Sequence, residues 1–127
     1  MTRPTCEIRE AHGLRLLALP SEGPPILREA EADEILSEAW GRDADLTLIP
    51  AERLSAAFFQ LETGLAGAIL QKFANYHMRI VILGDLAEQS ARSRALRDFI
   101  RESNAGESVW FLASLEDLER RLAASGA

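Results

Sequence analysis

Apolar and polar positions along the chain follow two alternating patterns. Short apolar runs rich in branched side chains occupy residues 5–10, 14–19, 45–50, 78–84 and 108–113, and they predict strands. Between these runs, apolar residues recur every three to four positions, which predicts helices over about residues 29–41, 63–76, 85–103 and 114–124. Asn104 and Gly106 are expected to end the third helix in a left-handed conformation.

The predicted order of elements is β-β-α-β-α-β-α-β-α. Strands that alternate with helices favour an α/β fold with a mostly parallel sheet, right-handed crossovers and helices packed on the sheet. His12-Gly13 suits a tight turn between the first two strands, so a hairpin should add one antiparallel strand and make the sheet mixed. The run "MRIVILG" (78–84) is typical of a strand that is covered on both faces.

Composition narrows the class of protein. The chain has 127 residues, the usual size of one domain, and we expect residues 1–127 to form a single α/β domain. Its net charge is −6, so it lacks the basic field that attracts nucleic acid or an anionic membrane surface. The N-terminus shows no signal peptide and no apolar run is long enough to span a membrane, which indicates a soluble cytoplasmic protein.

Motifs for common chemistry are not visible in the sequence. The single cysteine, Cys6, excludes an intramolecular disulfide and a zinc cluster, and we expect a buried, inert thiol. There is no Gly-x-Ser-x-Gly and no Gly-x-x-x-x-Gly-Lys sequence. We therefore assign no catalytic residue, no cofactor and no metal site.

The stretch "ETGLAGAILQKF" (62–73) combines a good helix start with two glycines. Thr63 is expected to cap the helix by accepting from the amide of Ala66, with Gly64 at the first helical position. Gly64 and Gly67 then lie on one stripe and leave a notch without side chains. The notch either allows close backbone packing within the fold or admits something from outside, a protein partner or an anion.

Nearly the whole chain resembles domain-of-unknown-function family 4180, a set of small bacterial α/β proteins. The resemblance is carried by "TGLAGAILQKFANY", "IVILGD" and "RSRALRDFIRESNAG". It implies an α/β fold but no particular activity.

A looser resemblance is to the STAS domain of sulfate transporters and anti-sigma-factor antagonists, which has the same strand–helix order. Helix two of that domain opens with Asp-Ser-Ser-Gly-Leu-Gly, and phosphorylation of the first serine of the antagonists breaks binding to an anti-sigma kinase. Aligning Gly64 places Glu62 on the phosphorylated serine and Thr63 on the second one. Glu62 departs from the motif because it carries a fixed negative charge and cannot be phosphorylated.

Two further charged residues fall near the carboxyl ends of the strands, where ligands of open parallel sheets collect. Asp85 follows a buried strand and is either part of a capping box with Glu88 or a ligand-binding carboxylate. Arg92 lies four and seven residues before Leu96 and Phe99, so it should point along the core side of its helix. It is expected to pair with Asp85 or Glu62, or to bind an anion.

Two functions follow as hypotheses. The first is a non-catalytic regulatory domain that binds a protein partner, or a second copy of itself, through Glu62, Thr63, Gly64 and Gly67. The second is an anion sensor or small enzyme in which Thr63 and Arg92 hold the anion and Asp85 acts as acid or base. A homodimer could form through the first strand if that strand lies at a sheet edge. Trp40 and Trp110 are expected either in the core, which is preferred, or at an interface.

Overall fold

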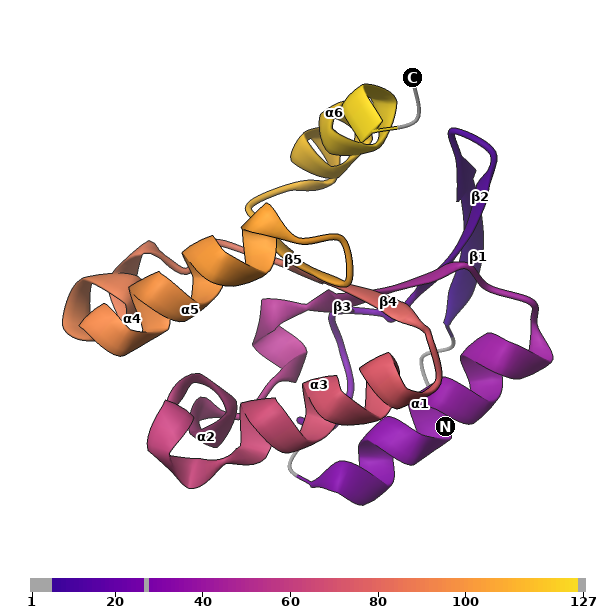
Figure 1. Ribbon diagram of the computed structural model, residues 1–127. Helices are drawn as coiled ribbons and strands as arrows, with labels where there is room; N and C mark the ends of the chain where they lie inside the picture. Colours follow the sequence, from indigo (N-terminus) through magenta and orange to yellow (C-terminus); the bar gives the residue numbers. More distant parts are fainter. Residues whose placement is uncertain (1–5, 27, 126–127) are drawn as a thin grey trace.

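A five-stranded mixed sheet organises the computed structural model, which describes residues 6–26 and 28–125. The strands lie side by side in chain order: β1 (Glu7–Ala11), β2 (Leu14–Ala18), β3 (Leu46–Pro50), β4 (Arg79–Leu83) and β5 (Val109–Leu112) (Figure 1). β1 pairs with β2 antiparallel, and the other three pairings are parallel. The expectation of an α/β fold with a mixed sheet is confirmed.

The helices that the structure describes lie between these strands, except for the last one, which follows β5. They are α1 (Glu29–Gly41), α2 (Ala56–Phe59), α3 (Leu65–Asn75), α4 (Ala87–Arg92), α5 (Arg94–Ala105) and α6 (Leu115–Ser125). Two short 3-10 helices, η1 (Ala51–Arg53) and η2 (Leu61–Thr63), flank α2. The bounds of α1 agree with the sequence prediction, and the predicted strands are each recovered within one or two residues at their described ends.

The β1–β2 hairpin turns at His12 and Gly13, as expected. Both residues have positive φ, +52° and +81°, which is the conformation of a two-residue type I′ turn. Ala11 and Leu14 flank this turn as a pair, so the register of the hairpin follows from the turn.

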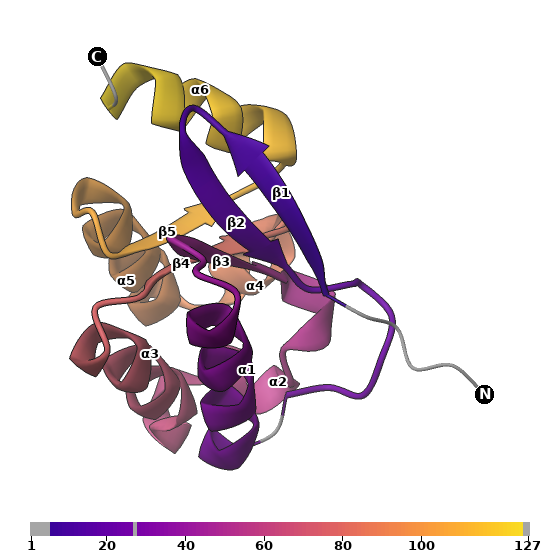
Figure 2. The same cartoon turned by 90° about the vertical axis from the view of Figure 1, so that its right-hand side faces the viewer.

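One face of the sheet is covered by the crossover helices. Because consecutive parallel strands are neighbours and crossovers are right-handed, α1, α3 and α5 all come to lie on the same face (Figures 1 and 2). The largest core cluster lies under them and includes Leu17, Ile49, Phe73, Ile82 and Phe111. This face holds most of the buried apolar surface that stabilises the fold.

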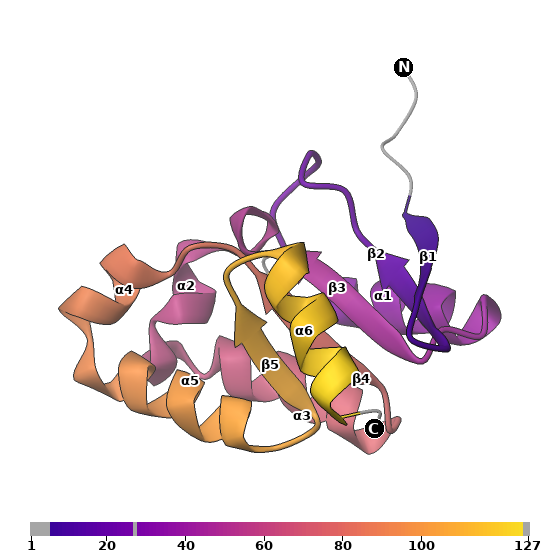
Figure 3. The same ribbon diagram turned by 90° about the horizontal axis from the view of Figure 1, so that it is seen from above.

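The opposite face of the sheet carries α6, which lies across β4 and β5 (Figure 3). Leu118 and Leu122 of α6 pack on Leu16, Leu46 and Trp110 in a second, smaller cluster. The sheet therefore has a core on each face, as "MRIVILG" predicted for β4.

Trp110 is the largest side chain of that second cluster and is 1% exposed. Its indole Nε1 donates to the carbonyl of Gly106 at 2.7 Å. The guanidinium groups of Arg79 and Arg121 lie over its ring, 4.6 and 4.4 Å from the centroid. Both arginines are half-buried and gain a cation–π contact with the ring.

The expectation of one continuous helix over residues 85–103 is wrong. The chain leaves the helical conformation at Ser93, where φ is −139° and ψ is 111°. The Ser93 hydroxyl accepts from the amide of Leu96 at 3.1 Å and so caps a new helix, α5. Gly106 follows α5 with φ −95°, and Asn104 lies inside α5, so the expected left-handed stop is also wrong.

Residues 51–63 form a segment that hydrophobic periodicity did not reveal. Arg53 in η1 donates to three carbonyls of the loop after β2, those of Pro20, Glu22 and Pro24, at 2.8–3.2 Å. These bonds hold the proline-rich loop against η1. In the described part of the chain, no helix has the length and apolar character needed to cross a membrane.

Candidate functional site

The carboxyl ends of β3 and β4 meet a group of short helices at one end of the sheet. The chain passes from Pro50 into η1, α2 and η2, and from Leu83 through Gly84 and Asp85 into α4. Figures 1 and 3 both show α2 and α4 at this end of the molecule. This is the edge at which the sequence analysis placed the candidate residues.

A groove runs between α2 and α4 and consists of two adjoining hollows of about 440 and 300 Å³. Ala56, Phe59 and Gln89 line both hollows, so the two form one continuous feature, which we call the α2–α4 groove. The larger hollow is also lined by Ala51, Glu52, Leu54, Leu83, Gly84 and Asp85. The smaller hollow is also lined by Gln60, Arg92, Ser93 and Leu96.

Gly84 and Asp85 form the floor of the groove at the end of β4. Gly84 has φ +154°, and a Cβ atom at this position would come within 2.7 Å of the Cβ of Ala51. Only glycine therefore allows η1 to approach β4 so closely. Asp85 is exposed, and its Oδ1 accepts from the amide of Ala87 at 2.9 Å. The carboxylate of Asp85 thus helps to start α4. The capping box with Glu88, one of the two alternatives from the sequence, is not formed, because Glu88 pairs with Arg92 instead.

Arg92 is not directed along the core side of a helix, so this prediction is wrong. Because the chain turns at Ser93, Arg92 is out of phase with Leu96 and its side chain is 77% exposed. Arg92 pairs with Glu88, one turn earlier in α4, at 2.8 Å, and not with Asp85 or Glu62. It borders the groove, but an exposed pair of this kind contributes only a few tenths of a kcal/mol, about 0.3–0.5.

Thr63 does not cap α3 in the way the sequence suggested. Its Oγ1 lies 2.7 and 2.8 Å from the carbonyls of Ala57 and Gln60, to which it donates, and it accepts from the amide of Leu65 at 3.3 Å. Gly64 is not the first helical residue: it has φ +77° and occupies the N-cap position. Thr63 thus ties the end of η2 to α2, and Gly64 makes the left-handed step from which α3 begins.

Gly67 lies in the first turn of α3 and faces open space. Apart from its chain neighbours and the nearby backbone of its own helix, no atom that the structure describes lies within 4 Å of the position its Cβ would take; for Gly64, too, nothing described beyond its chain neighbours lies within 4 Å. Close backbone packing inside the fold therefore does not explain these two glycines. They leave an exposed strip of backbone at the start of α3, next to Glu62, which is also exposed.

The structure thus divides the predicted residues into two groups. Glu62, Thr63, Gly64 and Gly67 form one exposed surface on η2 and the start of α3. A second group, Asp85 and Arg92, borders the α2–α4 groove from the α4 side. Phe59 and Gln60, which follows it, were missed because α2 is only four residues long and leaves no periodic signal. Gln89 of α4 was missed as well.

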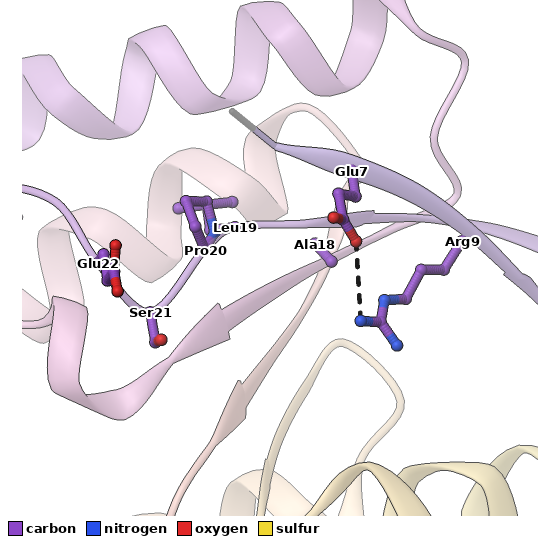
Figure 4. Close-up of a pocket in the computed structure, with 7 residues that line it drawn as sticks. All are labelled: Glu7, Arg9, Ala18, Leu19, Pro20, Ser21 and Glu22. Carbon is purple, nitrogen blue, oxygen red and sulfur yellow. Dashed lines mark ion pairs between the residues drawn. The ribbon is translucent and has the colours of Figure 1, made fainter. Parts of the chain in front are cut away.

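The described residues that line a hollow beside the β1–β2 hairpin do not form a group that suggests a catalytic or metal site. This hollow has a volume of about 310 Å³, and Glu7 and Arg9 pair there at 3.7 Å next to residues 18–22 (Figure 4). Both side chains of this pair are at least half exposed. Among the described residues, no group of three histidine, cysteine, aspartate or glutamate side chains could hold a metal ion.

Cys6 lies beside α1, far in the chain from the groove. Burial, and then a hydrogen bond with Glu38, raise the pKa of the Cys6 thiol to about 11. The thiol is therefore neutral at pH 7 and a poor nucleophile, because the thiolate is the reactive form.

Fold and site together define a small α/β domain with an exposed groove at the carboxyl edge of its sheet. The model of the family described as "Domain of unknown function (DUF4180)" matches residues 11–122. This match covers most of the chain, and the protein belongs to that family. No curated protein and no solved structure matches the chain.

Proposed function

We propose that this protein is a non-catalytic regulatory domain of STAS-like type that binds a protein partner at the carboxyl edge of its sheet. The partner would cover η2, the first turn of α3 and the adjoining α2–α4 groove. The observation that carries this proposal is Gly67, an exposed helical glycine with open space around it.

The argument from Gly67 is energetic. Glycine in a helix interior destabilises the fold by about 0.5–1 kcal/mol relative to alanine, and in the first turn, where Gly67 lies, it costs part of this. Close packing can compensate for that cost, but no described atom outside its own helix approaches Gly67. A partner whose backbone or side chain packs directly on the start of α3 supplies the missing reason for a glycine there.

The α2–α4 groove has the composition of a small interface. Half-buried Phe59 supplies apolar surface above buried Leu96, while Gln60, Gln89 and Arg92 form a polar rim. An apolar centre with a polar rim is the usual anatomy of a protein–protein contact. The groove suits one or two apolar side chains from a partner.

Exposed Glu62 supports the STAS-like part of the proposal. It lies in η2 just before α3, and the alignment of Gly64 with the antagonist motif places it where antagonist domains carry the serine whose phosphorylation breaks binding. A fixed carboxylate there would favour a partner with a basic group and would not depend on a kinase.

An anion sensor or small enzyme remains a second candidate, because Asp85 and Arg92 both border the groove. Two contacts weigh against it. The Thr63 hydroxyl is engaged with backbone carbonyls, and Arg92 is paired with Glu88. Inorganic phosphate and phosphate-bearing metabolites should raise the melting temperature by mass action if this candidate is correct, and a screen without a shift would count against it.

The decisive experiment replaces Gly67 with leucine. Because the position is open, Gly67→Leu should fold normally and lose a partner that wild-type protein captures from a cell extract. Gly106→Leu is the matched control, since a Cβ at Gly106 meets only an ordinary contact at 3.6 Å. If Gly67→Leu retains every partner of the wild type in pull-down and sizing, the proposed surface is wrong.

A further inference from the structure

Two aromatic side chains are exposed on the helical face of the molecule. Trp40 is 55% exposed and Tyr76 is 54% exposed, and they are the only large hydrophobic side chains this exposed among the described residues. Of the two alternatives for the tryptophans, the preferred one, the core, is therefore wrong for Trp40, whereas Trp110 is buried as predicted. Exposed tryptophan and tyrosine side chains that line the same surface are typical of an interaction site.

Both aromatic residues line one hollow of about 560 Å³ between α1 and α3. Leu36 lies at its base, and Asp33, Ser37 and Lys72 complete its lining. We call this feature the α1–α3 groove. It lies on the two crossover helices and shares no lining residue with the α2–α4 groove.

The aromatic residues occupy the C-terminal ends of the two helices. Trp40 is in the last turn of α1, and Tyr76 is the residue that follows α3. The two helices run in the same direction, because each connects neighbouring parallel strands, and Figure 1 shows their C-terminal ends on the same side. The C-terminus of a helix carries partial negative charge, so the rings lie in a field that attracts cations.

Carboxylates add to this field. Lys72 Nζ lies 2.9 Å from Asp33 Oδ1 and 3.7 Å from Glu29 Oε2, so two carboxylates face one ammonium group. This hydrogen bond with Asp33 raises the pKa of Lys72. α1 carries five acidic residues and no basic one: Glu29, Glu31, Asp33, Glu34 and Glu38.

We propose that the α1–α3 groove binds an arginine-bearing segment of a partner protein, with a guanidinium group stacked on Trp40 and Tyr76. Arginine fits because its planar group stacks on aromatic faces and is more weakly hydrated than the ammonium group of lysine. Asp33 lines the groove and supplies complementary charge: because Asp33 and Glu29 both face the single ammonium group of Lys72, this cluster carries one net negative charge. A two-fold dimer through this face does not fit, because it would bring the same acidic helix of a second copy against α1.

The test uses a blocked synthetic peptide of alternating alanine, arginine and leucine with four arginines. Its control is the same peptide with citrulline in place of arginine, which keeps the planar shape and removes the charge. Binding can be followed by tryptophan fluorescence, because Trp40 is exposed and Trp110 is buried. We expect the arginine peptide to change the emission of Trp40 and the citrulline peptide to bind about tenfold more weakly.

Variants locate the binding site. Trp40→Phe and Tyr76→Ala remove exposed surface and should fold normally, and Tyr76→Ala should weaken peptide binding about tenfold by calorimetry. Asp33→Asn should weaken it too, whereas Glu116→Gln makes the same change in net charge on α6 and should leave it unchanged. Equal losses for Asp33→Asn and Glu116→Gln would show general attraction to an acidic protein and would overturn the proposal.

Two other results would also overturn it. One is equal binding of the arginine and citrulline peptides, or no binding of either at millimolar concentration. The other is a dimer in sedimentation velocity that Trp40→Ala or Tyr76→Ala abolishes, because a second copy would then be the occupant of the groove. Neither result bears on the Gly67 surface, so this proposal and the proposed function can fail separately.

Discussion

The side chain of Asn104 forms two hydrogen bonds with the backbone of Phe111. Its Nδ2 donates to the Phe111 carbonyl at 3.1 Å, and its Oδ1 accepts from the Phe111 amide at 2.7 Å. Phe111 lies in β5, which pairs with β4 on its other side. The carboxamide therefore takes the place that the next strand of the sheet would occupy, and it joins α5 to the edge of β5.

Asn104→Ala should destabilise the protein by about 2–3 kcal/mol, because it removes two bonds and leaves part-buried backbone groups of Phe111 unpaired. The measurement is urea denaturation followed by circular dichroism. Asn75→Ala is the control: the Asn75 side chain pairs with Gln71 on the exposed surface of α3 and should contribute less than about 0.5 kcal/mol. Equal losses for the two variants would contradict this account.

Gly84→Ala should cost about 2–3 kcal/mol, because a Cβ would clash with Ala51 and the φ of +154° is strained for alanine. Adding Ala51→Gly removes the clash but not the strain, so the double variant should recover part of the loss. Thermal denaturation of the single and double variants forms a complete cycle. No recovery in the double variant would show that backbone strain alone requires the glycine.

The Cys6 thiol should react slowly with iodoacetamide, with a rate that rises around pH 11 and not near 9 as in the denatured chain. Since the pKa is raised in the folded state, its contribution to stability is complete below pH 9 and is lost as the pH rises through 11. Glu38→Gln should lower the thiol pKa, and Glu34→Gln on the same helix should not. A rate midpoint near 9 in the folded protein would contradict the burial argument.

The edge strand β1 is the place to test self-association. The Cys6 carbonyl accepts from Arg42 at 3.0 Å and so points away from β2. Because backbone groups alternate along a strand, those of Ile8 should also point outward and be free to pair. An antiparallel pair centred on Ile8 would place Glu7 of each copy opposite Arg9 of the other.

Glu7→Arg and Arg9→Glu should each abolish such a dimer, and a mixture of the two variants should restore it as a heterodimer. Sedimentation velocity at two concentrations measures this directly. Because the strand has only five residues, the wild-type dimer is expected to be weak, with a Kd on the order of micromolar or higher. A wild-type dimer that both single substitutions leave intact would exclude the β1 edge.

The periodicity of hydrophobic residues in the sequence was sufficient to predict most of the helices and strands. A strand such as Arg79–Leu83 is apolar enough to be recognised directly, and α1 has a clear stripe from Ala32 to Ala39. The hairpin followed from His12-Gly13 because few sequences tolerate two successive residues with positive φ. Each of these features depends on local chemistry, which a sequence displays.

Features that depend on where one element ends against another could not be predicted. Trp40 continues the apolar stripe of α1, but the end of α1 extends beyond the surface that α3 covers. The phase of Arg92 was wrong because a single extended residue, Ser93, rotates one helix relative to the next. The contacts of Arg53 with three carbonyls join segments about 30 residues apart, and no spacing in the sequence indicates them.

The two borders of the sheet are unequal, since Asn104 occupies one and strand β1 forms the other. Polymerisation by strand addition needs two receptive borders on every molecule, one to join the copy before it and one to join the copy after it. With a single receptive border, growth stops as soon as two molecules have met. This asymmetry would protect the native protein from fibre formation, and loss of the Asn104 bonds would remove that protection.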